Sequence, residues 1–210
     1  MVDTVQTVDA TSQRTRTWAE EADMVMSLLN CVVLDRESVY ASSEFTTGKR
    51  FYDLCREYGV RSDEELKRKM GPSYYEKLLG VNKNQGINFA RKLRGLGHFL
   101  VVTPNPFVAD PLKLKHNWTQ DEYLTFWKMV ITEKCSAVFF NEGWQYSNGC
   151  TFEYVVGLKA ELPLFDHNGA SLDTTRAITL LKAAIQDLEG DGFSVPKLRD
   201  VLDQLNHVSH

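Results

Sequence analysis

The stretch from Ser136 to Leu158 reads SAVFFNEGWQYSNGCTFEYVVGL and contains a strand, a loop and a helix in succession. The apolar run at 136–140 predicts a buried strand, because the strands of a parallel sheet are covered on both faces. A loop with one glycine follows at 141–148, a second glycine comes at position 149, and the apolar residues from Phe152 onward predict a helix. This order is one half of a βαβ unit.

The same alternation extends to both sides of this stretch. Further strands are predicted at 37–42, 98–103 and 162–165. Helices are predicted at 18–29, around 50–54, at 86–96, from Asn117 or Thr119 to Lys134, at 173–188 and at 195–205. Strands that alternate with helices predict an α/β fold, a doubly wound Rossmann- or flavodoxin-like parallel sheet of about four or five strands with helices on both faces.

The chain divides into three parts by composition. Residues 1–36 form a polar N-terminal leader and a helix, 37–190 the α/β domain, and 191–210 a C-terminal helix. Within the domain, 61–86 is rich in lysine and other charged residues, which indicates a helical insertion. We interpret this insertion as a surface excursion or an oligomer contact.

Composition excludes several classes of protein. With 210 residues, 43% of them hydrophobic, the chain is neither disordered nor fibrous, and no apolar run approaches the length of a membrane-spanning helix. We therefore expect a soluble, cytoplasmic protein. A net charge of −4 gives no reason to expect a nucleic-acid polymer as partner, so a small-molecule ligand is favoured. The four cysteines form no CxxC pair, which argues against structural zinc and against a disulfide framework.

Ligands of such sheets bind beyond the carboxyl ends of the strands, where two loops are unusual. The loop after the strand at 37–42 offers hydroxyl groups and backbone N–H groups ahead of a helix, which suits a phosphate. Its candidate binding residues are Ser42, Ser43, Thr46, Thr47 and Gly48. A plain N-capping loop is the alternative.

Three segments resemble a known family: VYASSEFTTGKRF from Val39, ARKLRGLGH from Ala90, and NEGWQYSNGCTFEYVVGLKAELPLF from Asn141. They resemble the nucleoside 2-deoxyribosyltransferase superfamily, including its deoxynucleoside 5′-monophosphate N-glycosidase branch. The resemblance covers residues 39–165 except the insertion. It implies that a strand tyrosine, here Tyr40, orients a helix glutamate, here Glu153, which attacks C1′ of the sugar.

The chemistry of the residues agrees with a catalytic role for Glu153. Cleavage of an N-glycosidic bond passes through an oxocarbenium-like centre that a carboxylate stabilises or captures. Glu153 lies between Phe152 and Tyr154 in an apolar stretch, where a solvated charge is not expected. The alternative is a glutamate that only favours an early helical turn through the helix dipole. Loop glycines Gly143 and Gly149 would let the sugar approach the backbone, as the resemblance implies.

The residue six positions before the glutamate separates the branches of the superfamily. The resemblance implies aspartate in transferases of free nucleosides and serine in monophosphate glycosidases, and this chain has Ser147. A serine that bonds its own backbone is the alternative. Glu44 departs from the family pattern, which more often has a neutral residue there. It could point to solvent, pair with Lys49 or Arg50, or contact a sugar or base.

Other candidates are less specific. Trp144 could stack on a base or anchor the loop by packing, and Asn141 could bond a base edge. His98 and His116 are expected to cap or pack. In the family, residues placed as Asn168 and Ser171 contribute to the neighbouring subunit's site.

The sequence therefore predicts an enzyme that hydrolyses a (deoxy)nucleoside 5′-monophosphate to free base and sugar 5-phosphate. The alternatives are base exchange by a nucleoside 2-deoxyribosyltransferase and a non-catalytic nucleotide-binding or interaction module. No metal or organic cofactor is implied. The apolar faces of the helices at 117–134 and 173–188 exceed what the sheet can cover, which predicts a homodimer or higher homo-oligomer with one of them at the interface.

Overall fold

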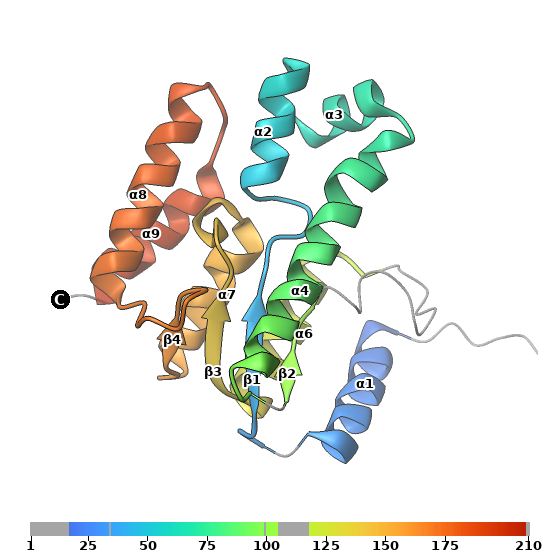
Figure 1. Cartoon of the computed structure of the whole chain (residues 1–210), viewed down its shortest axis with the longest axis vertical. Coiled ribbons are helices and arrows are strands. Elements are labelled where there is room, and N and C mark those ends of the chain that lie inside the picture. The colour runs from blue at the N-terminus through green and yellow to red at the C-terminus, as the bar shows by residue number, and fades with distance from the viewer. Residues whose placement is uncertain (1–16, 34, 99, 105–117, 209–210) are drawn as a thin grey trace, which may run out of the picture.

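A four-stranded sheet forms the centre of the protein (Figure 1). The computed structural model describes residues 17–33, 35–98, 100–104 and 118–208. All neighbouring strands are parallel, in the order β2-β1-β3-β4. The strands are β1 (Ser38–Ser42), β2 (Val101–Val102), β3 (Cys135–Phe140) and β4 (Leu164–Phe165). The predicted α/β fold with a parallel, Rossmann-like sheet is confirmed.

Eight helices and two short turns connect or flank these strands in the described residues. The helices are α1 (Trp18–Val32), α2 (Lys49–Tyr58), α3 (Asp63–Met70), α4 (Val81–Gly95), α6 (Gln120–Lys134), α7 (Asn148–Lys159), α8 (Thr174–Gly190) and α9 (Pro196–Val208). The turns are the π-helical η1 (Tyr75–Gly80) and the 3₁₀-helical η2 (Trp144–Tyr146). None of the described helices is long and apolar enough to cross a membrane.

Local sequence signals set the start of α1 and α6. Each begins with a capping box, in which a threonine side chain and a glutamate three residues later bond each other's backbone N–H groups. The pairs are Thr17 with Glu20 and Thr119 with Glu122. The cap of α6 is thus Thr119, whereas the alternative Asn117 lies outside the described residues.

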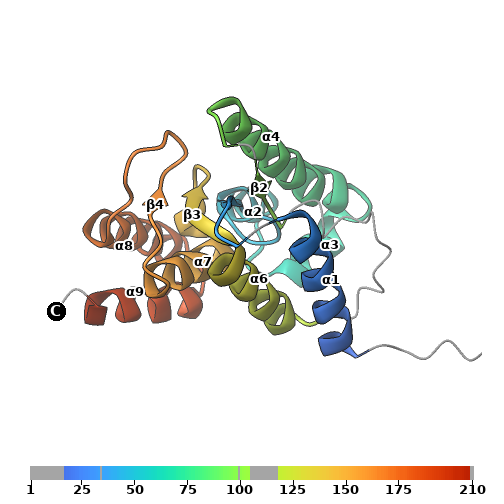
Figure 2. The ribbon, with the colours of Figure 1, turned by 90° about the horizontal axis from the view of Figure 1, so that it is seen from below.

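Successive residues of β1 point to opposite faces of the sheet, and helices cover both (Figure 2). Val39 and Ala41 pack with Phe89 and Leu93 of α4 on one face. Tyr40 joins the larger core formed with α6 and α7 on the other. Every residue of β1 is consequently buried, as the lack of polar alternation in SVYAS indicates.

The segment 61–86 is helical, and part of it belongs to the core as well as to the surface. It comprises α3, η1 and the first turns of α4, which continues through Gly86 to Gly95. Leu66 and Leu78 have no exposed surface and belong to the main core. Many charged residues surround these leucines in the sequence, so the composition of the segment conceals its apolar face.

The apolar faces of α6 and α8 are covered within a single chain. Phe126 and Val130 of α6 are buried, and the ring of Trp118 links Phe126 to Trp18 of α1. On the other side of the molecule α9 packs against α8 and α7. The excess of apolar surface from which a homodimer was predicted is therefore absent from these two described helices.

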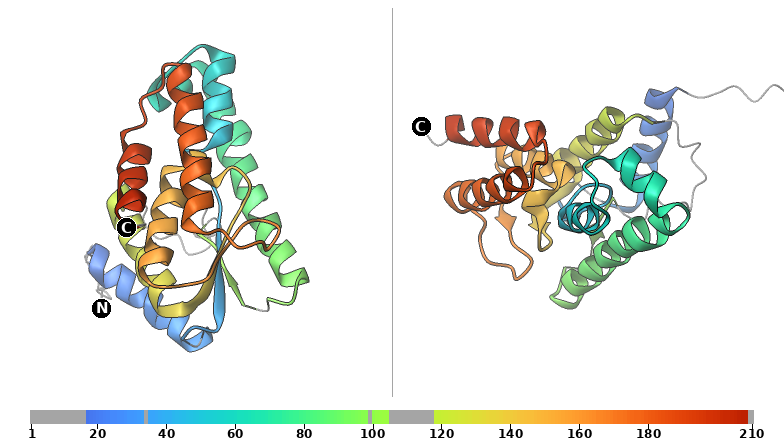
Figure 3. Two further views of the ribbon diagram at one scale, coloured as in Figure 1. Left: turned by 90° about the vertical axis from the view of Figure 1, so that its left-hand side faces the viewer. Right: turned by 90° about the horizontal axis from the view of Figure 1, so that it is seen from above.

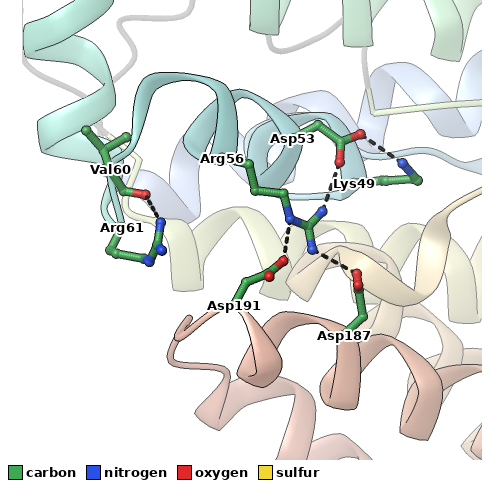
Figure 4. Close-up of polar contacts among 7 residues, drawn as sticks. All are labelled: Lys49, Asp53, Arg56, Val60, Arg61, Asp187 and Asp191. Atoms are coloured by element: carbon green, nitrogen blue, oxygen red, sulfur yellow. Dashed lines mark hydrogen bonds and ion pairs between the residues drawn. The ribbon is translucent and has the colours of Figure 1, made fainter.

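A cluster of charged residues joins α2 to α8 (Figure 4). The guanidinium of Arg56 donates to Asp53 at 2.9 Å, to Asp187 at 2.9 Å and to Asp191 at 2.5 Å. Two of these carboxylates belong to α8 or its C-terminal end, so one arginine fixes α2 against that helix. The C-terminal half of α2 is thereby held against α8.

Candidate active site

The loops after β1 and β3 meet at the carboxyl edge of the sheet, with α2 rising above that edge beside α8 (Figure 3). The backbone N–H of Asn141 donates to the carbonyl oxygen of Ser42 at 3.0 Å, which joins the two loops. Two helices, α2 and α7, begin directly after these loops. Their N-termini therefore lie in the region where ligands of parallel α/β sheets bind.

The carboxylate of Glu153 is the most strongly constrained polar group in this region. It lies on α7, is 5% exposed, and accepts a hydrogen bond at each oxygen. The hydroxyl of Tyr40 donates to Oε1 at 2.7 Å, and that of Ser42 donates to Oε2 at 2.5 Å. Tyr40 and Ser42 are two residues apart in β1, so their side chains share one face of the sheet.

These contacts determine the protonation of the group. Burial raises the pKa of Glu153 to about 7, while the hydrogen bonds from Ser42 and Tyr40 act in the opposite direction. Burial, followed by the charge of Glu153, raises the pKa of Tyr40 well above its usual value, so its hydroxyl stays protonated and donates. The site thus contains a carboxylate that titrates near neutral pH, held by two neutral donors.

Glu153 lines a cavity of about 520 Å³, a volume typical of small-molecule sites. Its walls come from the loop after β1, the N-terminal half of α7, and helices α6 and α9. Of the residues predicted from the sequence, it contains Ser43, Thr46, Thr47, Ser147, Gly149 and Glu153. The hydroxyl of Ser43 is buried and has no hydrogen-bond partner.

Ser147 caps α7 as well as lining this cavity. Its side-chain oxygen accepts from the backbone N–H of Cys150 at 3.3 Å, which is the local backbone bond considered as the alternative to phosphate binding. A capping serine uses an oxygen lone pair and keeps its hydroxyl hydrogen for another acceptor. Opposite, Thr47 accepts from the N–H of Asn148 at 3.2 Å and holds the two loops together.

Five predicted binding residues do not line the cavity: Ser42, Gly48, Asn141, Gly143 and Trp144. Ser42 contacts Glu153 instead of a phosphate position, and Gly48 lies under the side chain of Glu44. Asn141 and Gly143 line a second cavity of about 590 Å³, together with Glu44, Lys49 and Arg50. The sequence thus groups residues that the structure distributes between two cavities.

The prediction that Trp144 stacks on a base is wrong. Its side chain is 4% exposed and lines neither cavity. The ring is stacked on Tyr154 with centroids 5.1 Å apart and an interplanar angle of 17°, and it also contacts Phe140. Trp144 therefore anchors the loop to α7 by packing, the alternative considered above.

Glu44 turns away from solvent. It is 8% exposed, and its carboxylate lies over Gly48 at the N-terminus of α2. Burial raises the pKa of Glu44 to about 7, and the backbone N–H groups of Lys49 and Arg50 act in the opposite direction. Of the alternatives for Glu44, exposure to solvent is wrong, because the side chain is buried at the start of α2.

The cavity next to Glu153 also contains residues that the sequence did not suggest. Gln120 and Asp121 of α6 and Lys197 of α9 line it. Asp121 could have been predicted at this site, because α6 follows β2 and the segments after parallel strands begin at the same edge of the sheet. No sequence pattern indicates that α9 reaches this site.

Of the remaining candidates, His98 and Asn168 do not line the cavity. His98 packs against Phe139 with centroids 4.8 Å apart, as expected, and His116 lies outside the described residues. Asn168 contacts His167 and Lys92 in the turn after β4. The described residues contain no group of three or more His, Cys, Asp or Glu side chains that could hold a metal ion.

Comparison with known proteins gives one similarity. The profile of a family described as a domain of unknown function, DUF4406, matches residues 77–166. This segment extends from η1 to the residue after β4 and includes Glu153 and Ser147, but not β1 with Tyr40 and Ser42. The comparisons with curated proteins and with solved structures give no match.

Proposed function

We propose that the protein hydrolyses the N-glycosidic bond of a (deoxy)nucleoside 5′-monophosphate and releases free base and sugar 5-phosphate. The observation that carries this proposal is the buried Glu153 carboxylate, bonded by Tyr40 and Ser42 at the wall of a nucleotide-sized cavity. Such an arrangement suits attack on a carbon that acquires positive charge. The family resemblance of the loops after β1 and β3 supports the same assignment.

In the proposed reaction an oxygen of Glu153 bonds to C1′ as the C1′–N bond breaks. The electron pair of that bond goes to the base nitrogen, which takes a proton from water. A water molecule then adds its oxygen to C1′, displaces Glu153 as a free carboxylate and gives its proton to the hydroxide left by the first water. One water in total is therefore consumed, and it supplies hydroxyl to the sugar and hydrogen to the base. Tyr40 and Ser42 keep the carboxylate aimed and do not exchange protons.

The phosphate is assigned to the end of the cavity formed by Ser147, Thr46 and Thr47. Hydroxyl groups and the N-terminus of α7 converge there, and both favour an anion. Glu153 follows Ser147 by six residues, so its carboxylate lies about 1.7 turns further along the same helix. Sugar and phosphate would therefore extend along α7.

A panel of nucleosides and 5′-monophosphates tests the proposal. Chromatography of released base is expected to show release from monophosphates and little from nucleosides. Formation of a new nucleoside when a second base is added would instead identify base exchange. Binding without release from any member of the panel would identify a non-catalytic module.

The rate should depend on pH through Glu153. Attack requires the ionised carboxylate, and the pKa of Glu153 is about 7, so kcat/KM is expected to fall about tenfold for each pH unit below 7. Initial rates of base release between pH 5 and 8 measure this. A rate that stays constant down to pH 5 would contradict the assignment of a carboxylate with a raised pKa.

Replacement of Ser147 by aspartate should discriminate against phosphate. Aspartate caps a helix as well as serine does, so α7 keeps its N-cap, but a carboxylate repels the phosphate dianion. We expect Ser147→Asp to weaken 5′-monophosphate binding at least ~10-fold and nucleoside binding much less. Calorimetric titrations with both ligands measure the ratio, and equal losses would show that Ser147 serves only the loop.

The homodimer remains a prediction, now without support from α6 or α8. Light scattering at micromolar concentration measures it directly. A dimer would require an interface other than the covered faces of these two helices. A fully active monomer would confine the proposed site to one chain.

A further inference from the structure

The N-terminus of α2 carries an internal anion. Gly48 occupies the N-cap position and offers no side chain to the helix, and the first turn of α2 contains no acidic residue. The carboxylate of Glu44, four residues earlier, lies over Gly48 so closely that a Cβ built on this glycine would be 1.8 Å from Oε2. Glu44 thus takes the place that an external anion would take at a free helix N-terminus.

The contacts of this carboxylate are incomplete. Oε2 is buried without a hydrogen-bond partner, in a residue that is more than nine-tenths buried. A buried unsatisfied carboxylate oxygen carries a desolvation cost. This desolvation cost is not required for capping alone. A serine or aspartate at the N-cap position caps a helix near the surface, without burying an unsatisfied carboxylate oxygen.

Glu44 also lies at the boundary between the two cavities. Ser43 and Phe45, its neighbours in sequence, line the cavity with Glu153, whereas Glu44 lines the cavity with Lys49 and Arg50. A phosphate could reach hydroxyl groups and a helix N-terminus on either side of this loop. The negative charge of Glu44 makes one of these two positions unfavourable for it.

We propose that Glu44 is a specificity-determining residue that excludes phosphate-like anions from the N-terminus of α2 and leaves the N-terminus of α7 as their binding position. The exclusion itself stands on the contacts of Glu44. Its consequence, that the 5′-phosphate of the substrate binds beside Ser147, rests on the proposed function. Removal of the carboxylate should therefore create an anion site where the wild-type protein has none.

Sulfate is a suitable probe, because it stays a dianion across neutral pH and requires no catalysis. Amide chemical shifts are followed by NMR during a sulfate titration at pH 8, where Glu44 with its pKa of about 7 is ionised. In the wild-type protein we expect no saturable shift at Lys49 or Arg50. In Glu44→Ala we expect saturable shifts at both amides and an affinity at least ~10-fold higher at this position.

Glu142→Ala is the matched control, since Glu142 lines the same cavity but is exposed. Glu142→Ala should show the same sulfate binding as wild type. An equal gain of sulfate affinity in Glu44→Ala and Glu142→Ala would show that the loss of any negative charge is sufficient, and it would overturn the proposal. If Glu44→Ala does not fold, Glu44→Ser removes the same carboxylate and leaves a hydroxyl in the buried loop. Saturable shifts at Lys49 and Arg50 in the wild-type protein would overturn the proposal without any variant.

The outcome is separate from that of the proposed function. A protein that releases no base can still show the predicted gain of sulfate binding in Glu44→Ala. Conversely, base release from 5′-monophosphates together with sulfate binding at wild-type α2 would support the reaction and refute the role of Glu44.

Discussion

Glu153→Gln is expected to lower base release at least ~100-fold while ligand binding survives. Glutamine keeps the size of the side chain and an oxygen that accepts from Tyr40 or Ser42, but it removes the negative charge that faces C1′. Loss of a transition-state interaction lowers kcat with little change in ligand affinity. Single-turnover base release and calorimetric binding of the monophosphate measure the two effects separately.

The same variant should be more stable than wild type at pH 8. The pKa of Glu153 is raised from 4.5 to about 7 in the folded protein, so its contribution to stability is fully present below pH 4.5 and is lost as the pH rises through 7. Above pH 7 the ionised buried carboxylate costs about 1–3 kcal/mol, which glutamine avoids. Urea unfolding at pH 8 measures this difference.

Glu142→Gln provides the control for both measurements. Glu142 is an exposed carboxylate in the neighbouring cavity, and its replacement should change neither base release nor stability appreciably. If Glu153→Gln retained activity, or if Glu142→Gln lost it, the catalytic carboxylate would have to be reassigned.

Gly48→Ala is expected to destabilise the protein by about 2–4 kcal/mol. Gly48 has φ of 150°, which L residues rarely adopt, and an added Cβ would lie 1.8 Å from Oε2 and 2.6 Å from Cδ of Glu44. The buried side chain of Glu44 would have to leave its position. Urea unfolding measures the loss of stability.

Two further variants separate backbone strain from this clash. Gly59 also has a positive φ, of 61°, but nothing lies within 4 Å of a Cβ added there, so Gly59→Ala reports strain alone. In the double variant Glu44→Ala/Gly48→Ala the overlap with Oε2 and Cδ is removed, and only the Cβ of residue 44 stays 2.6 Å from the added Cβ. The two changes should therefore cost at least ~1 kcal/mol less together than their sum. Additive costs would show that Glu44 and Gly48 do not interact.

The fold could be predicted because its signals are local. SVYAS and SAVFF are continuous apolar runs, and capping residues such as Thr119 precede amphipathic helices. The strand at 98–103 was predicted too long, since the described part of β2 covers only Val101–Val102, where it pairs with Val39 and Tyr40 of β1. Pairing length depends on the partner strand, which a local pattern does not contain.

The site was only partly predictable. Tyr40 and Glu153 follow from the strand and helix motifs together with the resemblance, and the structure brings them within hydrogen-bond distance. The positions of Ser42, Trp144 and Glu44 depend on side-chain directions within the two loops, which residue types do not determine. The approach of α9 to the cavity depends on packing between helices distant in sequence.

The location of β1 at the centre of the sheet has a consequence for how the molecule folds. Tyr40 and Glu153 are 113 residues apart in the chain, and β1 pairs with both β2 and β3, which come later in the chain. Contacts of such long range close late and slow the search for the native state. The hydrogen bonds from Tyr40 and Ser42 to Glu153 therefore form only when the whole sheet has assembled. A partly folded chain in which β1 is unpaired contains the helix with Glu153 but lacks these two donors.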